Sequence, residues 1–352
     1  MAVIEAEAHS WAVFGAGHIG GELIAQVGKP DVAERFGLRQ DPEFVVRRTG
    51  LVKAGDLDKV YAENIDHQEI PDVTFIALPS SGLELANAVM TQALEAGRVV
   101  VTAEKGILSS APSFERFRTL SDNFSRLGIN ATVGGGTRLM KLMQAYTTDV
   151  PNVTEAHLAV NGTLTSIFHA VASGASLGQA VSSAKTNGFA EPEQTSPHEV
   201  IRGEVTGDVP KKIAILFNFL GLGETLLDAG DIEDTLSEAE IRRAVAEAKT
   251  RRYVVSLYQR DLYDEDTEGI IAKHVHTHDS WQIVTGFQNV DRNPLIAPLG
   301  KLADAGNGFV IGLGPSETDG VYGNKGPGAG EAPTVNTMLD DWLTISRANS
   351  KG

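Results

Sequence analysis

Over the first 110 residues, short runs of β-branched and aromatic residues alternate with longer segments in which apolar positions have helical spacing. The runs "SWAVFG", "EFVVRRTG", "DVTFIALPSSG" and "GRVVVTAEKG" have the length and composition of buried strands that end in turns. Strands that alternate with helices in this way form a parallel sheet with helices on both faces. The pattern therefore predicts an α/β fold that begins with a doubly wound parallel sheet.

The pattern changes near residue 150. Amphipathic helical segments come first, and candidate strands follow in "RYVVSLYQRDL", "IIAKHVHTH", "WQIVTGFQNV" and "GFVIGLG". The Gly-rich "YGNKGPGAGEAPT" is expected to break the strand pattern before a closing helix, "PTVNTMLDDWLTISRA". We expect a first domain over residues 1–150, a second α+β domain over residues 151–325, and packing of residues 326–352 onto the first.

Three glycines lie between the first strand and the first helix, in "VFGAGHIGG". Gly15 permits a tight turn, Gly17 lets a pyrophosphate approach the backbone, and Gly20 lets helix and strand pack closely. The diphosphate would lie at the helix N-terminus. The spacing predicts a Rossmann domain that binds a dinucleotide, and a plain tight turn is the alternative. The expected cofactor contacts in this loop are Gly15, Ala16, Gly17, His18, Ile19 and Gly20.

The end of the second strand indicates which nicotinamide cofactor is preferred. An NAD-specific site usually carries an acidic residue there, whereas this chain has Arg47 and Arg48. Two guanidinium groups can clamp a 2′-phosphate, so we expect NADP rather than NAD. A solvated strand end is the alternative reading.

Polar residues follow the next two strands, at the edge of the sheet where ligands of this fold class bind. They are Ser80 and Ser81 in "ALPSSG", and Thr102 and Lys105 in "VTAEKG". A serine in such a place is often a turn former. The position of Lys105 beside the cofactor crevice also suits a direct role.

Composition narrows the class of partner. The net charge of −16 and the pI near 5.0 disfavour nucleic acid and anionic membranes. The chain has no Cys, so thiol nucleophiles and disulfides are excluded. "MAVIEAEAHS" has no basic segment or long apolar run, which favours a cytoplasmic location.

The order of motifs over nearly the whole chain resembles the homoserine dehydrogenase family. The motifs are "GAGHIG", "VTAEKG", "VGGG", "VNGTLTSIF", "GFAEPE", "EVTGDVPKKIAIL", "NPLIAPLGKLADAGNGFVI" and "GPGAGEAPT". The resemblance implies a Rossmann domain, an α+β domain that also forms a homodimer, and reduction of aspartate 4-semialdehyde to homoserine with NAD(P)H. That reaction belongs to the biosynthesis of threonine and methionine. We expect a monofunctional enzyme, since no segment remains for a kinase or a regulatory tail.

The resemblance also assigns site residues. It makes Glu191 and Asp208 the carboxylates that bind homoserine, Lys212 the catalytic lysine, and Lys105 its partner near the nicotinamide. Glu204 takes the place of a usual Asp in this set. The remaining matches are substrate-side Asn161, Gly162 and Thr163, and cofactor-side Gly328 and Ala329.

Several positions depart from the family pattern. The segment between Glu191 and Glu204 is longer than usual, Glu104 replaces a common Asn, and "GGGTRLM" lacks the usual Ile-Pro. The family's monovalent-cation site uses a side-chain carboxylate where this chain has Asn130. The backbone carbonyls of Val133, Gly135 and Thr137 remain as candidate sodium ligands.

The spacing in "GDVPKKIAIL" by itself places a lysine and a carboxylate on one face of a helix. On a helix that starts near Asp208, Lys212 shares the apolar face with Asp208 and Ile215, whereas Lys211 lies nearer solvent. A partly buried ammonium aimed by a carboxylate suits a proton donor to a developing alkoxide. A surface ion pair one helical turn apart is the alternative, worth about 0.3–0.5 kcal/mol.

Three histidines in "KHVHTHD" alternate along a candidate strand. His274, His276 and His278 would share one side, which suits a metal site, but no carboxylate-rich partner segment or HExxH pattern supports one. We therefore favour a solvated edge strand.

Two other functions remain open. A relative could act on another amino-acid semialdehyde or ketone, since the longer insert would reshape the pocket. A non-catalytic NADP sensor would keep the glycines without needing Glu191, Asp208 and Lys212 together. Aspartate semialdehyde dehydrogenase is excluded because it requires a Cys nucleophile.

Overall fold

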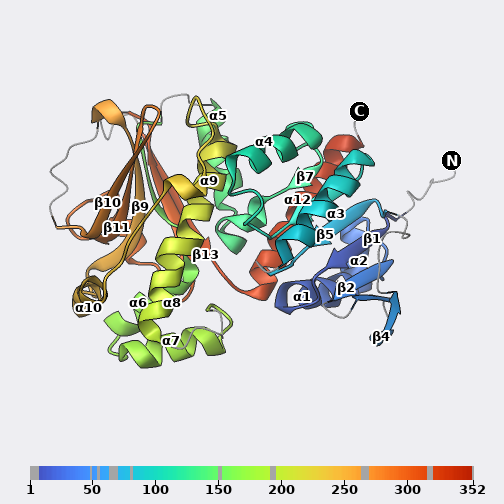
Figure 1. Ribbon diagram of the computed structural model, residues 1–352, viewed down its shortest axis with the longest axis horizontal. Coiled ribbons are helices and arrows are strands. Elements are labelled where there is room, and N and C mark those ends of the chain that lie inside the picture. The colour runs from blue at the N-terminus through green and yellow to red at the C-terminus, as the bar shows by residue number, and fades with distance from the viewer. Residues whose placement is uncertain are drawn as a thin grey trace. The chain divides into compact units, whose positions relative to one another are not determined.

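The computed structural model describes residues 8–47, 50–53, 56–62, 70–79, 82–149, 153–190, 196–262, 269–314 and 320–350. The chain divides into two compact units (Figure 1). Unit 1 consists of residues 1–108, 112–132 and 334–352. Unit 2 consists of residues 109–111 and 133–333. The division into domains at residues 150 and 326 stays a prediction.

Unit 1 contains a seven-stranded sheet in the order β4-β3-β2-β1-β5-β6-β7. Strands β2, β1, β5, β6 and β7 are parallel neighbours, and β3 and β4 extend the edge by antiparallel pairing. The predicted Rossmann-like sheet is confirmed, but the antiparallel extension was not expected from the sequence. The elements of this unit are β1 (Trp11–Phe14), α1 (His18–Val27), α2 (Pro30–Phe36), β2 (Phe44–Arg47), β3 (Gly50–Lys53), β4 (Asp56–Ala62), β5 (Val73–Ile76), α3 (Leu83–Glu95), β6 (Val99–Thr102), α4 (Ala111–Leu120), β7 (Leu127–Gly128) and α12 (Glu331–Asn349).

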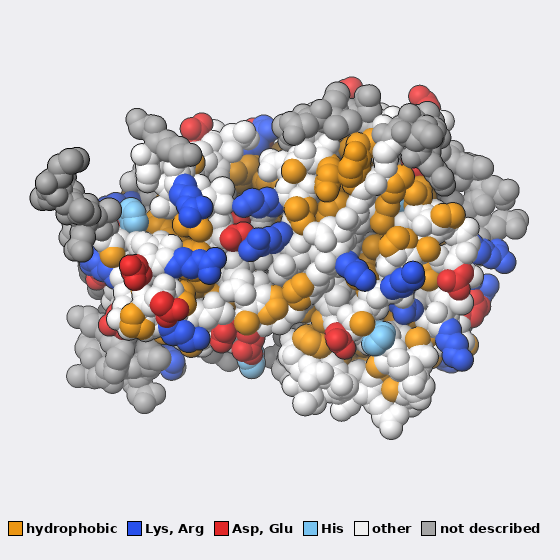
Figure 2. Space-filling model, turned by 180° about the vertical axis from the view of Figure 1, so that it is seen from behind, with side chains coloured by type: hydrophobic (Ala, Val, Ile, Leu, Met, Phe, Trp, Pro, Cys, Tyr) orange, Lys and Arg blue, Asp and Glu red, His pale blue; other side chains and the backbone are white. Residues whose placement is uncertain are grey.

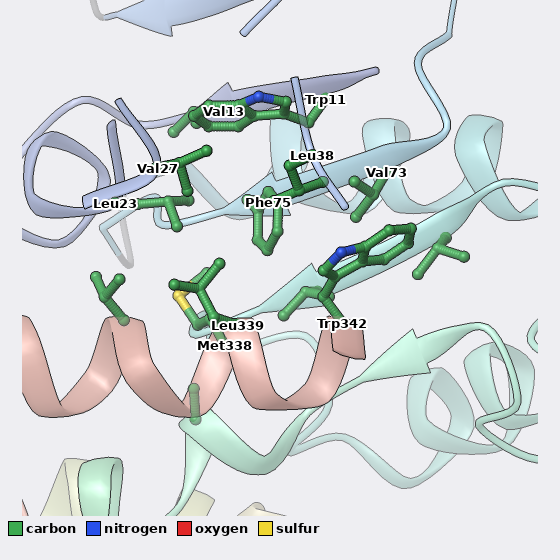
Figure 3. Close-up of a cluster of buried hydrophobic side chains, with 14 of the residues drawn as sticks. Trp11, Val13, Leu23, Val27, Leu38, Val73, Phe75, Met338, Leu339 and Trp342 are labelled. Carbon is green, nitrogen blue, oxygen red and sulfur yellow. The ribbon is translucent and has the colours of Figure 1, made fainter. Parts of the chain in front are cut away.

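One face of this sheet is covered by α1 and by the C-terminal helix α12. Alternate residues of β1 and β5, among them Trp11 and Phe75, pack against Leu23 of α1 and against Met338 and Trp342 of α12 (Figure 3). The Trp342 indole N–H also donates to the Phe36 carbonyl over 2.8 Å. The last helix of the chain is therefore part of the core of unit 1.

A buried carboxylate fixes α12 to the end of β7. Asp341 is 4% exposed and accepts hydrogen bonds from the Asn130 backbone N–H at 2.9 Å and from its side-chain Nδ2 at 2.6 Å. A Cβ atom on Gly128 would lie 2.6 Å from the Asp341 Cβ atom. Only glycine at position 128 permits this close approach.

Unit 2 contains a six-stranded antiparallel sheet in the order β10-β11-β9-β8-β12-β13. The predicted α+β class of the second part is confirmed. Its strands are β8 (Glu155–Ala159), β9 (Arg251–Gln259), β10 (Ile271–His278), β11 (Trp281–Asn289), β12 (Gly306–Gly312) and β13 (Val321–Pro327). Its helices are α5 (Leu139–Asp149), α6 (Gly162–Ala172), α7 (Leu177–Thr186), α8 (Pro197–Gly203), α9 (Val209–Leu220), α10 (Glu238–Ala246) and α11 (Ala297–Gly300).

The Gly-rich segment before the last helix does not interrupt the sheet, so this expectation was wrong. Strand β13 pairs with β12 over its whole length. A Cβ atom on Gly323 would lie 2.8 Å from the Phe309 carbonyl oxygen. Glycine here allows the close approach of two backbones, which local propensity does not reveal.

None of the helices in the described ranges is long and apolar enough to cross a lipid bilayer.

Candidate active site

The glycine loop after β1 has the geometry of a dinucleotide cradle. Gly15 adopts a positive φ of 98°, and a Cβ atom there would lie 2.4 Å from the Ala77 carbonyl oxygen. A Cβ atom on Gly20 would lie 1.8 Å from the Gly15 carbonyl oxygen, whereas one on Gly17 would meet nothing within 4 Å. Gly15 and Gly20 therefore close the turn, while Gly17 leaves the backbone open at the N-terminus of α1. The described residues fit a bound pyrophosphate.

The residues expected to choose between NADP and NAD are only partly described. Arg47 ends β2, and its buried Nε atom has no hydrogen-bond partner among the described residues. Arg48 lies outside the described residues, as do Ser80 and Ser81. Of these four residues the structure describes only Arg47, which lies at the carboxyl end of β2.

The turn after β6 holds Lys105 by means of its neighbour. The Thr102 side chain is fully buried, and its hydroxyl accepts a hydrogen bond from the Glu104 N–H at 3.0 Å. The carboxylate of Glu104, 5% exposed, accepts the N–H groups of Gly106 at 2.5 Å and Ile107 at 3.1 Å. Thr102 and Glu104 thus build the turn and leave Lys105 at its middle.

In unit 2, the segment with the acidic residues is a wide helical turn. Residues Glu204–Asp208 form a π-helical turn between α8 and α9, and the Val209 N–H donates to the Glu204 carbonyl. Pro210 explains this, because it has no N–H for the Thr206 carbonyl and its ring would clash with that carbonyl in a continuous α-helix. The expectation of a helix that starts near Asp208 is confirmed, since α9 begins at Val209. The π turn joins α9 to α8, which the sequence did not lead us to expect.

The Lys212 ammonium is enclosed by two oxygen acceptors. Its Nζ atom lies 2.6 Å from Asp208 Oδ2 and donates to the Val160 carbonyl oxygen at 2.8 Å. The lysine side chain is 10% exposed and that of Asp208 is 18% exposed. Lys211, the residue before it, is only half-buried. An isolated surface pair would be weak, but this pair is largely buried and has a third partner.

Asn161 brings a second carboxylate to the cluster. Its Nδ2 atom donates to Glu204 Oε2 at 2.6 Å and to Asp208 Oδ2 at 2.9 Å. Its Oδ1 atom accepts the Leu164 N–H at 2.7 Å and so caps α6. The structure thus gathers Asn161, Glu204, Asp208 and Lys212 from two separate places in the sequence.

Two of the other substrate-side positions lie at the start of α6. Gly162 begins α6, and a Cβ atom there would lie 2.8 Å from the Ala305 carbonyl oxygen. The Thr163 hydroxyl donates to the Phe189 carbonyl, two residues before Glu191. Glu191 itself lies outside the described residues.

The loop with Gly328 and Ala329 packs closely on its surroundings within unit 2. The Gly328 N–H donates to the Ala305 carbonyl at 2.8 Å, and a Cβ atom on Gly328 would lie 2.1 Å from Cγ of Asn307. A Cβ atom on Gly162 would lie 3.2 Å from that of Ala329. The loop therefore adjoins the N-terminus of α6, which places it near Asn161.

The candidate sodium ligands lie in a turn at the start of unit 2. Val133 is fully buried, Gly135 has a φ of 51°, and the Thr137 hydroxyl donates to the Pro327 carbonyl at 3.1 Å. Asn130, which replaces the family's carboxylate, donates its side-chain N–H to Asp341. Sodium binding stays a prediction.

The three histidines lie on the edge strand β10 but are not solvated. His276 Nε2 lies 2.7 Å from Asp234 Oδ1, and His274 Nε2 accepts the Thr235 N–H at 3.1 Å. His278 contacts Thr225 instead. No group of three metal-ligating side chains occurs in the part of the chain that the structure describes. His274 and His276 thus tie the segment around Asp234 to the sheet.

Two contributors were missed in the sequence. The Val160 carbonyl could not be found, because main-chain acceptors leave no residue signal. Pro210 inside an otherwise helical pattern was a visible signal of a helix irregularity, and it adjoins both Asp208 and Lys212.

Curated relatives are similar over almost the whole chain. Homoserine dehydrogenase of Mycobacterium leprae is 26% identical over 349 residues, which cover 96% of this chain and 72% of the relative. Homoserine dehydrogenase of Mycobacterium tuberculosis is 26% identical over 357 residues, with the same coverage.

Solved structures agree on the fold. The homoserine dehydrogenase of Thermoplasma acidophilum has a TM-score of 0.67 at 18% identity, covering 97% of this chain and 99% of that one. A hyperthermophilic archaeal homoserine dehydrogenase in complex with NADPH has a TM-score of 0.64 at 18% identity, covering 97% and 98%.

The family model for homoserine dehydrogenase matches residues 140–343, which is more than half of the chain. Members are NAD(P)-dependent oxidoreductases that reduce aspartate 4-semialdehyde to homoserine. As the order of its motifs predicted, the chain belongs to the homoserine dehydrogenase family.

Proposed function

We propose that this protein catalyses the reversible reduction of L-aspartate 4-semialdehyde to L-homoserine, with NADPH as the preferred cofactor. The observation that carries the proposal is the largely buried ion pair of Lys212 with Asp208, held beside a second carboxylate. An amino-acid semialdehyde offers an ammonium for the carboxylates and a carbonyl oxygen for the lysine. One cluster can thus bind both the ammonium group and the carbonyl group of this substrate.

Bound NADPH supplies the hydride. As the carbonyl oxygen gains negative charge, the Lys212 ammonium stabilises it and donates a proton to it. Asp208 aims the ammonium through its 2.6 Å contact, and the Val160 carbonyl fixes a second N–H direction. The third N–H of Lys212 is then the proton available to the substrate.

The substrate ammonium needs carboxylates, and we assign Asp208, Glu204 and Glu191 to it. Asp208 and Glu204 carry more negative charge than Lys212 alone offsets, so this cluster favours a cation. Gly162 and Thr163 bound the substrate side at the start of α6. Lys105, at the carboxyl edge of the unit 1 sheet, is proposed as the second catalytic lysine.

The comparison of two adjacent lysines tests the assignment. Lys212→Ala should lower kcat for aspartate 4-semialdehyde by a factor on the order of 10²–10⁴, with NADPH binding nearly unchanged, because a positioned general acid is lost. Lys211→Ala, the matched control on the same helix, should change little. Equal losses at both positions, or near-normal turnover in Lys212→Ala, would refute the role of Lys212.

A substrate screen separates this reaction from its relatives. NADPH oxidation by the purified protein should be fastest with aspartate 4-semialdehyde among small semialdehydes and ketones. A faster rate with another carbonyl compound would assign the enzyme to that substrate. A protein that binds NADPH without any turnover would instead be a sensor.

Cofactor choice follows from the guanidinium groups at the end of β2. We expect wild type to bind NADPH more tightly than NADH, because Arg47 and Arg48 pair with the 2′-phosphate. The double change to Ala should weaken NADPH binding selectively, measured by calorimetry. Similar affinities of wild type for both cofactors would contradict this.

We also propose the homodimer, the cytoplasmic location and the sodium site at Val133, Gly135 and Thr137 that the sequence led us to expect. Light scattering measures the first. Titration with Na⁺ at constant ionic strength, followed by NADPH oxidation rates, measures the last.

A further inference from the structure

We propose that Asn161 is a positioning residue that holds Glu204 and Asp208 together as a charged pair, rather than a group that contacts the substrate. The proposal rests on the function proposed above and concerns the same cluster. Its starting point is the hydrogen-bonding capacity of one side chain. A carboxamide has two N–H donors and one oxygen acceptor.

Each of these groups already has a partner in the structure. The two N–H groups of Asn161 point to Glu204 Oε2 at 2.6 Å and Asp208 Oδ2 at 2.9 Å. The oxygen accepts the Leu164 N–H at 2.7 Å. The side chain is 5% exposed. A substrate could take an Asn161 donor only by displacing one of the carboxylates.

The carboxylates need such a donor. Because one nitrogen lies within hydrogen-bonding distance of both, the two negative charges are close enough to repel each other. Lys212 offsets the charge on Asp208 directly, since its ammonium touches the same Oδ2 atom. Asn161 gives one charge-assisted hydrogen bond to each carboxylate, and this favours the state in which both are ionised.

The charges that accompany the pair on its own and adjoining helices can be named for the described residues. Helices α8 and α9 pack directly on the π turn. The Glu199 carboxylate caps α8 through Ser196, and the Arg202 guanidinium donates to the Leu236 carbonyl. The titratable or charged side chains on these two helices and the π turn are His198, Glu199, Arg202, Glu204, Asp208, Lys211 and Lys212.

Two substitutions of Asn161 remove its N–H donors but keep an oxygen that can cap α6. Asn161→Ser and Asn161→Asp both retain an oxygen that can cap α6, so neither variant removes the helix cap. Both lose the two N–H donors, and Asn161→Asp adds a third negative charge. A control is Asn218→Ser on α9: Asn218 is 7% exposed, and its side-chain amide bonds to the main chain of Leu227 through both its nitrogen and its oxygen.

The expected result is a change in the pH profile. In Asn161→Ser the acid limb of kcat/KM should move to higher pH, and in Asn161→Asp it should move further, because proton uptake by the pair becomes easier. At neutral pH, KM for the semialdehyde should rise about tenfold to a hundredfold, and kcat should fall less. Asn218→Ser should keep the wild-type profile even if it melts earlier.

A second measurement does not depend on turnover. Carbon-13 NMR of labelled carboxyl groups should show that Glu204 and Asp208 titrate at higher pH in Asn161→Ser, with Glu204→Gln and Asp208→Asn used for assignment. Unchanged titration, or a loss in kcat with no shift of the acid limb, would overturn the positioning role. A wild-type protein that does not reduce the semialdehyde would instead overturn the proposed function and leave the NMR test intact.

Discussion

Three neighbouring glycines at the N-terminal end of α1 have different structural roles. Gly20 has no room for a Cβ atom, since it would lie 1.8 Å from the Gly15 carbonyl oxygen. Gly17 has room, but its open side is where the backbone would meet a diphosphate. Gly21, next along α1, has room and a helical interior position.

These differences predict three distinct outcomes at neighbouring positions. Gly20→Ala should lower the free energy of unfolding by about 1–3 kcal/mol through overpacking. Gly17→Ala should leave stability nearly unchanged and weaken NADPH binding by about tenfold or more, since a methyl group occupies the approach to the backbone. Gly21→Ala should affect neither adversely, because alanine is the better helix former by about 1 kcal/mol.

Thermal denaturation and calorimetric titration of the three variants measure these effects. Equal losses of NADPH affinity at all three positions would contradict the separate roles. So would a large loss of stability in Gly17→Ala.

At the scale of elements, local sequence patterns correctly predicted the features whose contacts join residues close together in the chain. The fingerprint loop, the strands β9 to β12 and the pairing of Asp208 with Lys212 follow from spacing alone. The partners of Asn161 lie 43 and 47 residues away. Strand β13 exists because β12 offers it a ladder, not because its residues favour strands. Such long-range contacts decide the parts that the sequence did not reveal.

The segment around Asp234 joins two strands through one carboxylate. Asp234 accepts hydrogen bonds from His276 on β10 and from the Tyr253 hydroxyl on β9, both at 2.7 Å. Burial alone raises the pKa of Asp234, but hydrogen bonds from His276 and Tyr253 help to outweigh it and leave the pKa below its ordinary value. Burial and the nearby Asp234 raise the pKa of Tyr253 well above its usual range.

This predicts how stability depends on acid. A carboxyl whose pKa is lowered by folding stabilises the folded state above its ordinary pKa of about 3.9, and that contribution is lost as pH falls through the lowered value. Asp234→Asn should cost about 1–3 kcal/mol at neutral pH and flatten the decline of the melting temperature below roughly pH 4.

Asp261→Asn, on an exposed residue, is the control for a changed carboxylate. Calorimetry between about pH 3 and pH 7 makes the comparison. A decline in Asp234→Asn as steep as in wild type would show that other carboxylates govern the acid transition.

For the whole molecule, the net charge repels anions, whereas local groups at the cofactor loop attract them. The net charge of −16 repels anions at long range. Figure 2 nevertheless shows basic side chains interspersed with acidic and hydrophobic ones on the displayed face. Attraction of an anionic cofactor must therefore come from local features, such as the N-terminus of α1 and Arg47, acting within a Debye length of about 8 Å.

The two units also differ in how the chain builds them. Unit 2 is nearly continuous in sequence, over residues 133–333, whereas unit 1 needs segments from both sides of it. A chain that ends at residue 333 should therefore keep slow hydrogen exchange in β9 and β11 but lose it in β1 and β5, which pack on α12 in the full chain. Protection of β1 and β5 without α12 would contradict this dependence.

The packing of α12 on β1 has a consequence for the order of events during synthesis. The ribosome makes Trp11 and Val13 early, but their partners Met338 and Trp342 come after all of unit 2. In the meantime the part of this apolar sheet face that α12 will cover is exposed, and exposed apolar surface is what chaperones bind and what aggregates form from. The nascent chain should thus depend on holding factors at its N-terminal part until α12 leaves the exit tunnel.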